Sequence, residues 1–299
     1  MTSDSFTGAI ASGALVLDGG LSNQLEAAGH DLSDELWSAR LLAEEPEAIV
    51  AAHRAYYEAG ADVAITASYQ ATFEGFARRG IGRERAGELI ASSVELARDA
   101  AIGSDRPLWV AASVGPYGAM LADGSEYRGR YGLSEEELYA FHRPRLDVLA
   151  GAGPDAFALE TVPDADEARA LVRAVRGLGV PAWLSYSVDG VLTRAGQPLE
   201  EAFAVAADAE EVVAVGVNCC APGDVEGAVR IAARVTEKPV VVYPNSGEEW
   251  DAEARAWAGR ATFAPDQVTA WRDAGARLIG GCCRVGPGAV TGIAAALGR

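Results

Sequence analysis

The stretch A-F-A-L-E-T-V-P-D-A-D-E-A-R-A-L-V-R-A-V-R-G-L-G-V-P-A-W-L-S-Y-S-V, residues 156–188, decides the fold. It begins and ends with an apolar run rich in strand-forming residues. Between the two runs, residues 164–178 carry an apolar stripe at helical spacing. Asp164 with Glu167 forms a possible capping box at the start of this helix, and Gly179 suits its carboxyl end. The stretch therefore predicts strand, helix and strand in succession.

The same alternation continues along the whole chain. The apolar runs that predict strands lie at 14–20, 62–69, 108–115, 156–161, 181–188, 213–219, 239–245 and 276–282. Runs that are apolar throughout are typical of parallel strands covered on both faces. Eight strand–helix units in this length predict an α/β fold, a single (β/α)8 TIM barrel forming one domain over 1–299. We expect a helix starting at Pro46, and a flexible polar tail over residues 1–12.

The composition of the chain argues against some classes of binding partner. The formal net charge is −18, which argues against a nucleic-acid partner and fits poorly with an anionic membrane surface. No apolar run approaches the length of a membrane span, and the first residues lack the features of a signal peptide. We therefore expect a cytoplasmic protein with reduced thiols. No additional element suggests assembly, so we also expect a monomer.

Two pairs of adjacent cysteines fall where strands six and eight end, at 219–220 and 282–283. Barrel closure would bring these strand ends to one centre, on the face where barrels of this type carry their chemistry. Converging thiolates suit a soft tetrahedral metal, and zinc is the expected one. Alternation along a strand predicts one ligand from the first pair and two after Gly280-Gly281, which leaves one position open. The alternative is that the cysteines are small buried hydrophobes.

Acidic residues also end two of the apolar runs. Asp18 and Glu160 are costly in such positions without a partner, so either an arginine pairs with each or both hold a substrate ammonium. The segment 117–134 is too long for a simple connection and is either a mobile lid or an ordered surface loop. His30, His53 and His142 belong to no metal-binding pair motif.

Several motifs resemble those of homocysteine S-methyltransferases of the S-methylmethionine-using type. They include L-D-G-G-L-S-N-Q-L-E (17–26), A-D-G-S-E-Y-R-G (122–129), G-V-N-C (216–219) and L-I-G-G-C-C-R (278–284). The resemblance runs from about residue 14 to 295 and implies a zinc-dependent barrel. Cys220 and the pair Ser22-Asn23 depart from the commoner family pattern.

The resemblance also implies roles for individual residues. It implies zinc ligation by Cys219, Cys282 and Cys283, which would act in catalysis through the metal, and binding of the homocysteine amino group by Asp18 and Glu160. It further implies that backbone around Gly19 and Gly20, with the Thr66 hydroxyl, receives the homocysteine carboxylate. Ser68 and Asn218 would line the same pocket.

The implied chemistry is methyl transfer to a thiol. A free thiol has a pKa near 8.5, and zinc would bind it as the thiolate nucleophile. A sulfonium donor, S-methylmethionine or S-adenosylmethionine, leaves as a neutral thioether and needs no general acid. The alternatives are a selenocysteine methyltransferase or one that uses betaine or a folate as donor, a phosphate-handling barrel, and a non-catalytic zinc- or thiol-binding barrel.

Overall fold

The computed structural model describes residues 5–32, 36, 38–251 and 256–299. Eight parallel strands form one sheet in the order β1-β12-β9-β8-β5-β4-β3-β2. Their bounds are β1 (Leu15–Val16), β2 (Val63–Ile65), β3 (Trp109–Val114), β4 (Ala156–Val162), β5 (Ala182–Tyr186), β8 (Val212–Asn218), β9 (Val240–Tyr243) and β12 (Ala276–Ile279). A bridge between Leu17 and Val63 joins the first strand to the second and closes the barrel. The predicted (β/α)8 barrel is confirmed, and each predicted apolar run overlaps one strand of the barrel sheet.

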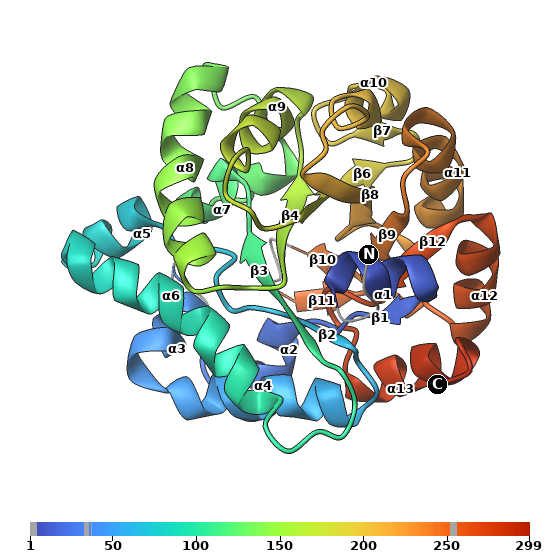
Figure 1. The fold of residues 1–299 in the computed structure, drawn as a ribbon, viewed down its shortest axis with the longest axis horizontal. Helices are drawn as coiled ribbons and strands as arrows, with labels where there is room; N and C mark the ends of the chain where they lie inside the picture. The colour runs from blue at the N-terminus through green and yellow to red at the C-terminus, as the bar shows by residue number, and fades with distance from the viewer. Residues whose placement is uncertain (1–4, 33–35, 37, 252–255) are drawn as a thin grey trace.

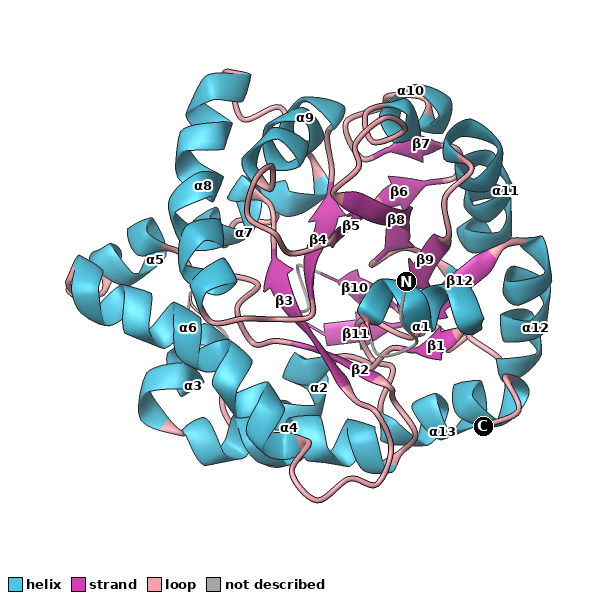
Figure 2. Cartoon of the chain, viewed as in Figure 1, coloured by secondary structure: helices cyan, strands magenta, loops and turns pink. Residues whose placement is uncertain are grey.

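Helices surround the strands on the outside (Figures 1 and 2). The helices after the first are α2 (Leu21–Ala27), α3 (Ser38–Glu44), α4 (Pro46–Glu58), α5 (Phe73–Arg78), α6 (Arg83–Ala100), α7 (Tyr117–Leu121), α8 (Glu135–Gly151), α9 (Ala165–Ala174), α10 (Leu199–Ala204), α11 (Val225–Thr236), α12 (Pro265–Ala274) and α13 (Pro287–Ala296). Two short antiparallel hairpins, β6 (Val188–Asp189) with β7 (Leu192–Thr193) and β10 (Glu249–Asp251) with β11 (Ala256–Ala258), lie outside the barrel sheet. Within the described residues, no helix is both long and apolar enough to cross a membrane.

The helix predicted at 164–178 is present and starts after Asp164 as predicted, but its capping contacts and its carboxyl end differ. Asp164 caps α9 by accepting from the amide of Asp166 at 2.9 Å, but Glu167 does not complete a capping box. Glu167 is instead buried and accepts from the amide of Tyr117 at 2.6 Å and from His142. The helix ends at Ala174 and not near Gly179. A tertiary partner thus overrides the local capping pattern. The helix predicted from Pro46 is α4.

The expected flexible tail over residues 1–12 is wrong for its described part. Residues Phe6–Ser12 form α1, which Ser5 caps by accepting from the amide of Gly8 at 3.1 Å. Phe6 and Ile10 are buried in the cluster that fills the barrel interior. The ring of Phe6 lies 5.9 Å from that of Trp109, at the start of β3. The helix therefore covers the amino-terminal end of the strands, because its apolar face completes a core that the barrel alone leaves open.

Candidate metal centre and substrate site

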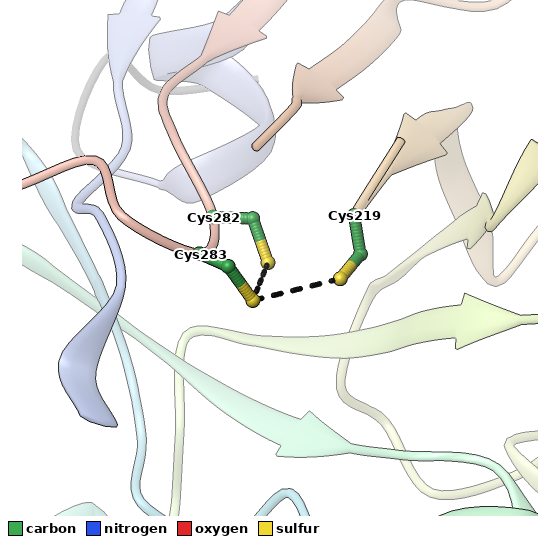
Figure 3. Close-up of side chains that lie close together, drawn as sticks. All are labelled: Cys219, Cys282 and Cys283. Carbon is green, nitrogen blue, oxygen red and sulfur yellow. Dashed lines mark hydrogen bonds between the residues drawn. The ribbon is translucent and has the colours of Figure 1, made fainter. Parts of the chain in front are cut away.

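Three cysteine side chains meet at the carboxyl ends of the strands (Figure 3). Cys219 follows β8 directly, and Cys282 and Cys283 follow β12. The Sγ atoms of Cys219 and Cys283 are 3.8 Å apart, and those of Cys282 and Cys283 are 4.0 Å apart. All three sulfurs lie within 4.8 Å of one another. This is a donor set for one soft metal ion.

Hydrogen bonds from backbone amides hold the two halves of this cluster together through Tyr243 at the end of β9 and the two residues after it. The amide of Cys219 donates to the carbonyl of Tyr243 at 3.1 Å, and the amide of Cys282 donates to that of Pro244 at 2.7 Å. The amide of Cys283 donates to Oδ1 of Asn245 at 3.1 Å. Cys219 has a φ of +49°, a left-handed conformation that turns the chain just after β8. The spacing of the sulfurs therefore follows from the protein backbone itself.

Cys220 lies apart from this cluster. Its side chain is fully buried in the hydrophobic core and does not belong to the group of converging sulfurs. Burial raises the pKa of its thiol well above the usual range, so it stays protonated. Cys220 thus lies away from the cluster as expected, but the cause is the turn at Cys219 and not alternation along a strand, because β8 ends at Asn218.

The pKa values of the three clustered thiols shift in opposite directions. Hydrogen bonds from Cys282, Cys283 and then Tyr127 hold the pKa of Cys219 well below its usual range. Hydrogen bonding to Cys219 raises the pKa of Cys282 and of Cys283. The hydroxyl of Tyr127 lies 3.0 Å from Sγ of Cys219. A metal cation would favour the thiolate form of all three.

Asp18 and Glu160 are both buried, with 1% and 7% of their surface exposed. Oδ2 of Asp18 accepts from the amide of Ile65 at 2.8 Å, whereas Oδ1 has no hydrogen-bond partner within the described residues. Glu160 accepts a hydrogen bond from the hydroxyl of Ser113. The pairing with arginine that the sequence left open does not occur for either residue within the described part of the chain.

Burial dominates the electrostatics of these two carboxyls. It raises the pKa of Glu160 to about 7 and the pKa of Asp18 well above its usual range. The charge of Glu160 raises the pKa of Asp18 further, so the two carboxyls act on one another. Two buried acids without a countercharge form an environment that a cationic group would stabilise.

Thr66 and Ser68 are buried but hydrogen-bond to each other. Their hydroxyl oxygens are 2.7 Å apart. The amide of Ser113 donates to Thr66 at 3.0 Å, and Ser68 donates to the carbonyl of Ser113 at 2.8 Å. The two predicted pocket residues thus fix the position of Ser113, which in turn contacts Glu160.

Asn218 fixes the backbone next to Glu160. Its side-chain oxygen accepts from the amide of Thr161 at 2.7 Å, and its side-chain nitrogen donates to the Thr161 hydroxyl at 2.7 Å. Thr161 has a φ of +58°, which is unfavourable for a β-branched residue unless other contacts hold it. Asn218 therefore links the end of β8 to the end of β4.

Gly19 and Gly20 permit the first loop to pack against the cysteine loop. A Cβ on Gly19 would lie 2.0 Å from the carbonyl oxygen of Val285, and one on Gly20 would lie 2.7 Å from that of Cys282. The amide of Gly20 donates to Val285 at 3.0 Å. Asn23, one of the departures from the family pattern, accepts from the amide of Arg284 at 2.7 Å.

Other residues lie at the site to which the sequence analysis assigned no role. Ser113 contacts Glu160, Asn245 holds Cys283, and Tyr127 reaches Cys219. Tyr243 lies among the same groups, and its hydroxyl is 2.7 Å from that of Ser185. Ser113, Tyr243 and Asn245 lie at or just after strand ends, which is the one signal that the sequence offers for them.

Tyr127 belongs to the segment 117–134, and the structure gives this segment an ordered form. It contains α7 and a 3₁₀ turn at Ser125–Tyr127. Gln70 donates to the carbonyl of Ala119 at 2.9 Å, which fixes α7 against the loop after β2.

The fold and the site together define a (β/α)8 barrel with a three-cysteine cluster that could hold a metal ion at the carboxyl ends of its strands. The sequence model of the homocysteine S-methyltransferase family matches residues 15–297. The chain therefore belongs to the homocysteine S-methyltransferase family, which is a family of enzymes.

Individual relatives agree with this assignment. Homocysteine S-methyltransferase 4 of Zea mays is 50% identical to this chain over an alignment of 308 positions, gaps included. The alignment covers 96% of this chain and 90% of the maize protein. A selenocysteine Se-methyltransferase of Brassica oleracea var. italica is 44% identical, with 94% of this chain and 88% of that protein covered. The crystal structure of the homocysteine methyltransferase MmuM from Escherichia coli, in its metallated form, superposes on this chain with a TM-score of 0.85. The two sequences are 44% identical, and the match covers 94% of this chain and 96% of that one.

Proposed function

We propose that this protein is a zinc-dependent methyltransferase that moves a methyl group from a sulfonium donor to the thiol of homocysteine, giving methionine. The observation that carries the proposal is the three-sulfur cluster beside two buried carboxyls without a countercharge. Four-coordinate zinc with bonds of about 2.3 Å to sulfur would separate its sulfur ligands by about 3.8 Å, close to the spacing described above. The cysteines therefore fit zinc.

Cys219, Cys282 and Cys283 would hold the zinc, and the fourth position would take the homocysteine thiol in its ionised form. Asp18 and Glu160 would bind the homocysteine ammonium and so fix the direction of the bound sulfur. The Gly20 amide and the Thr66 hydroxyl already have protein partners, so binding the carboxylate there would require an exchange of hydrogen bonds. Ser68 and Asn218 would act by positioning Ser113 and Thr161.

The transfer itself makes one carbon–sulfur bond and breaks another. The homocysteine thiolate supplies the electron pair of the new bond to the methyl carbon. The pair of the old bond stays with the donor sulfur, which leaves as a neutral thioether, and the thiol proton is lost to solvent. No general acid is required, and holding the two sulfurs in line with the methyl group supplies much of the acceleration.

A methyl-transfer assay tests this function. The protein is given homocysteine with S-methylmethionine or S-adenosylmethionine, before and after treatment with a chelator, and its bound metal is measured by elemental analysis. We expect one zinc per chain, methionine production, and loss of both after chelation. Absence of transfer from every sulfonium donor to homocysteine by the zinc-loaded protein would refute the proposal.

Methyl transfer to a selenol is the second candidate, favoured by the selenocysteine Se-methyltransferase among the relatives. The same assay with selenocysteine as acceptor compares the two values of kcat/KM. The preferred donor, the monomeric state and the cytoplasmic location remain predictions.

A further inference from the structure

We propose that Glu126 recognises the sulfonium charge of the methyl donor. This inference rests on the proposed function and adds a residue for the second substrate. Its basis is a buried carboxyl beside the metal centre that the homocysteine site does not use.

Glu126 occupies a fixed position in the 3₁₀ turn Ser125–Tyr127. Its backbone packs closely against α7, because a Cβ added to Gly118 would lie 2.4 Å from the amide nitrogen of Glu126. The next residue, Tyr127, contacts Sγ of Cys219 through its hydroxyl. The turn therefore places Glu126 next to a residue whose side chain reaches the cysteine cluster.

The side chain of Glu126 is buried, and no cation among the described residues pairs with it. Only 5% of its surface is exposed, and Oε2 has no hydrogen-bond partner within the described residues. Burying a carboxylate in this way is costly unless a cation or several donors face it. A cationic ligand would offset the cost, because the attraction between opposite charges is stronger away from bulk water.

The location of Glu126 favours the donor over homocysteine as its ligand. Asp18, just after β1, and Glu160, on β4, already provide for the homocysteine ammonium. Tyr127 is 38% exposed, yet its hydroxyl contacts Cys219, so this side chain extends from the surface to the metal centre. The donor has to approach the thiolate from the open side of the metal centre, and Tyr127 marks such a route.

The ring of Tyr127 also suits a positive charge. The guanidinium of Arg194 lies 5.9 Å from the ring centroid, so the ring already faces one cation. The sulfonium must lie nearest to the metal centre, since its methyl group is transferred there. Its charge disappears when the neutral thioether forms, so a carboxylate beside it binds the donor more tightly than the product.

The test compares Glu126→Gln with the wild-type protein and with Asp123→Asn. Asp123 is an exposed acid on the same segment, and asparagine can still accept from the amide of Ser125. Burial raises the pKa of Glu126 to about 7, so the assays are run at about pH 8, where the carboxyl is ionised. Donors are S-methylmethionine and trimethylsulfonium, which has neither an ammonium nor a carboxylate.

We expect Glu126→Gln to raise KM for both donors by on the order of tenfold, since it removes an attraction made before the reaction. The homocysteine KM and the zinc content should stay within about twofold of wild type. Asp123→Asn should change neither these two values nor the KM of either donor. Glu126→Asp, which keeps the charge, should recover part of the donor affinity.

Three results would overturn the proposal. They are an unchanged donor KM in Glu126→Gln, an equal rise in the homocysteine KM, and a rise for S-methylmethionine with none for trimethylsulfonium. If Glu126→Gln loses zinc or does not fold while Glu126→Asp keeps full function, the donor KM is measured in Glu126→Ser instead. A normal donor KM there also counts against the proposal. If wild type transfers no methyl group from any sulfonium, the proposed function itself fails.

Discussion

Replacing Glu160 with glutamine should stabilise the free protein at alkaline pH while weakening its binding of homocysteine. Burial raises the pKa of Glu160 from 4.5 to about 7. Between these values the folded protein holds a proton that the unfolded chain has lost, so stability falls as pH rises through this window. The difference corresponds to roughly 3 kcal/mol once Glu160 is fully ionised. Glutamine removes this cost and can still accept from Ser113.

The measurement is urea unfolding of metal-free protein without homocysteine, at about pH 5 and about pH 8.5. The stability of Glu160→Gln relative to wild type should be roughly 2–3 kcal/mol more favourable at the higher pH. Any pH-independent cost of burying the amide cancels in this comparison. Glu95→Gln, which removes an exposed acid on α6, is the matched control and should show no such difference.

Binding should change in the opposite direction. A hydrogen bond to a charged group contributes roughly 1.5–3 kcal/mol, so kcat/KM for homocysteine should fall on the order of tenfold or more in Glu160→Gln. Thiols that lack the amino group should be affected much less, and zinc content should be unchanged. A relative stability that is the same at both pH values, or an equal loss of activity with both kinds of thiol, would refute this account of Glu160.

Three further predictions concern the rest of the site and the fold. Cys282→Ser should lose zinc and activity, whereas Cys220→Ala should keep both, as measured by elemental analysis and turnover; full zinc retention in Cys282→Ser contradicts the ligand set. Asn218→Ala removes both hydrogen bonds to Thr161 and should lower the free energy of unfolding by roughly 1–3 kcal/mol. It should also reduce kcat/KM for homocysteine without loss of zinc. Wild-type kinetics in this variant would show that the Thr161 backbone needs no such support. Phe6→Ala should cost roughly 3–5 kcal/mol in urea unfolding with kcat unchanged, and an unchanged stability would show that α1 contributes nothing to the core.

The barrel could be predicted from the sequence because its strands are continuous apolar runs with helical stripes between them. The three cysteines could be placed at one face because that face follows from strand direction alone. In both cases the signal is local or depends only on topology.

The misses share one physical cause, which is contact between segments distant in sequence. Glu167 looks like a capping residue, yet a backbone amide from another loop binds it. Phe6 lies in a short polar segment, but the barrel interior provides a surface for it. Pairing of β3 with β4 brings Ser113 beside Glu160, and the loop after β3 brings Tyr127 to Cys219 at the end of β8.

The position of β12 has a consequence for how the protein is made. This strand pairs with β1 on one side and β9 on the other, and it leads directly into Cys282 and Cys283. During synthesis it emerges after the other seven strands, so a growing chain carries an open sheet with only one of the three proposed ligands, Cys219. Closing the barrel and completing the ligand set are then one event. With the proposed ligand set, a metal ion could be held only after residue 283 has been translated, and a chain truncated before β12 would lack both the closing strand and two of the three proposed ligands.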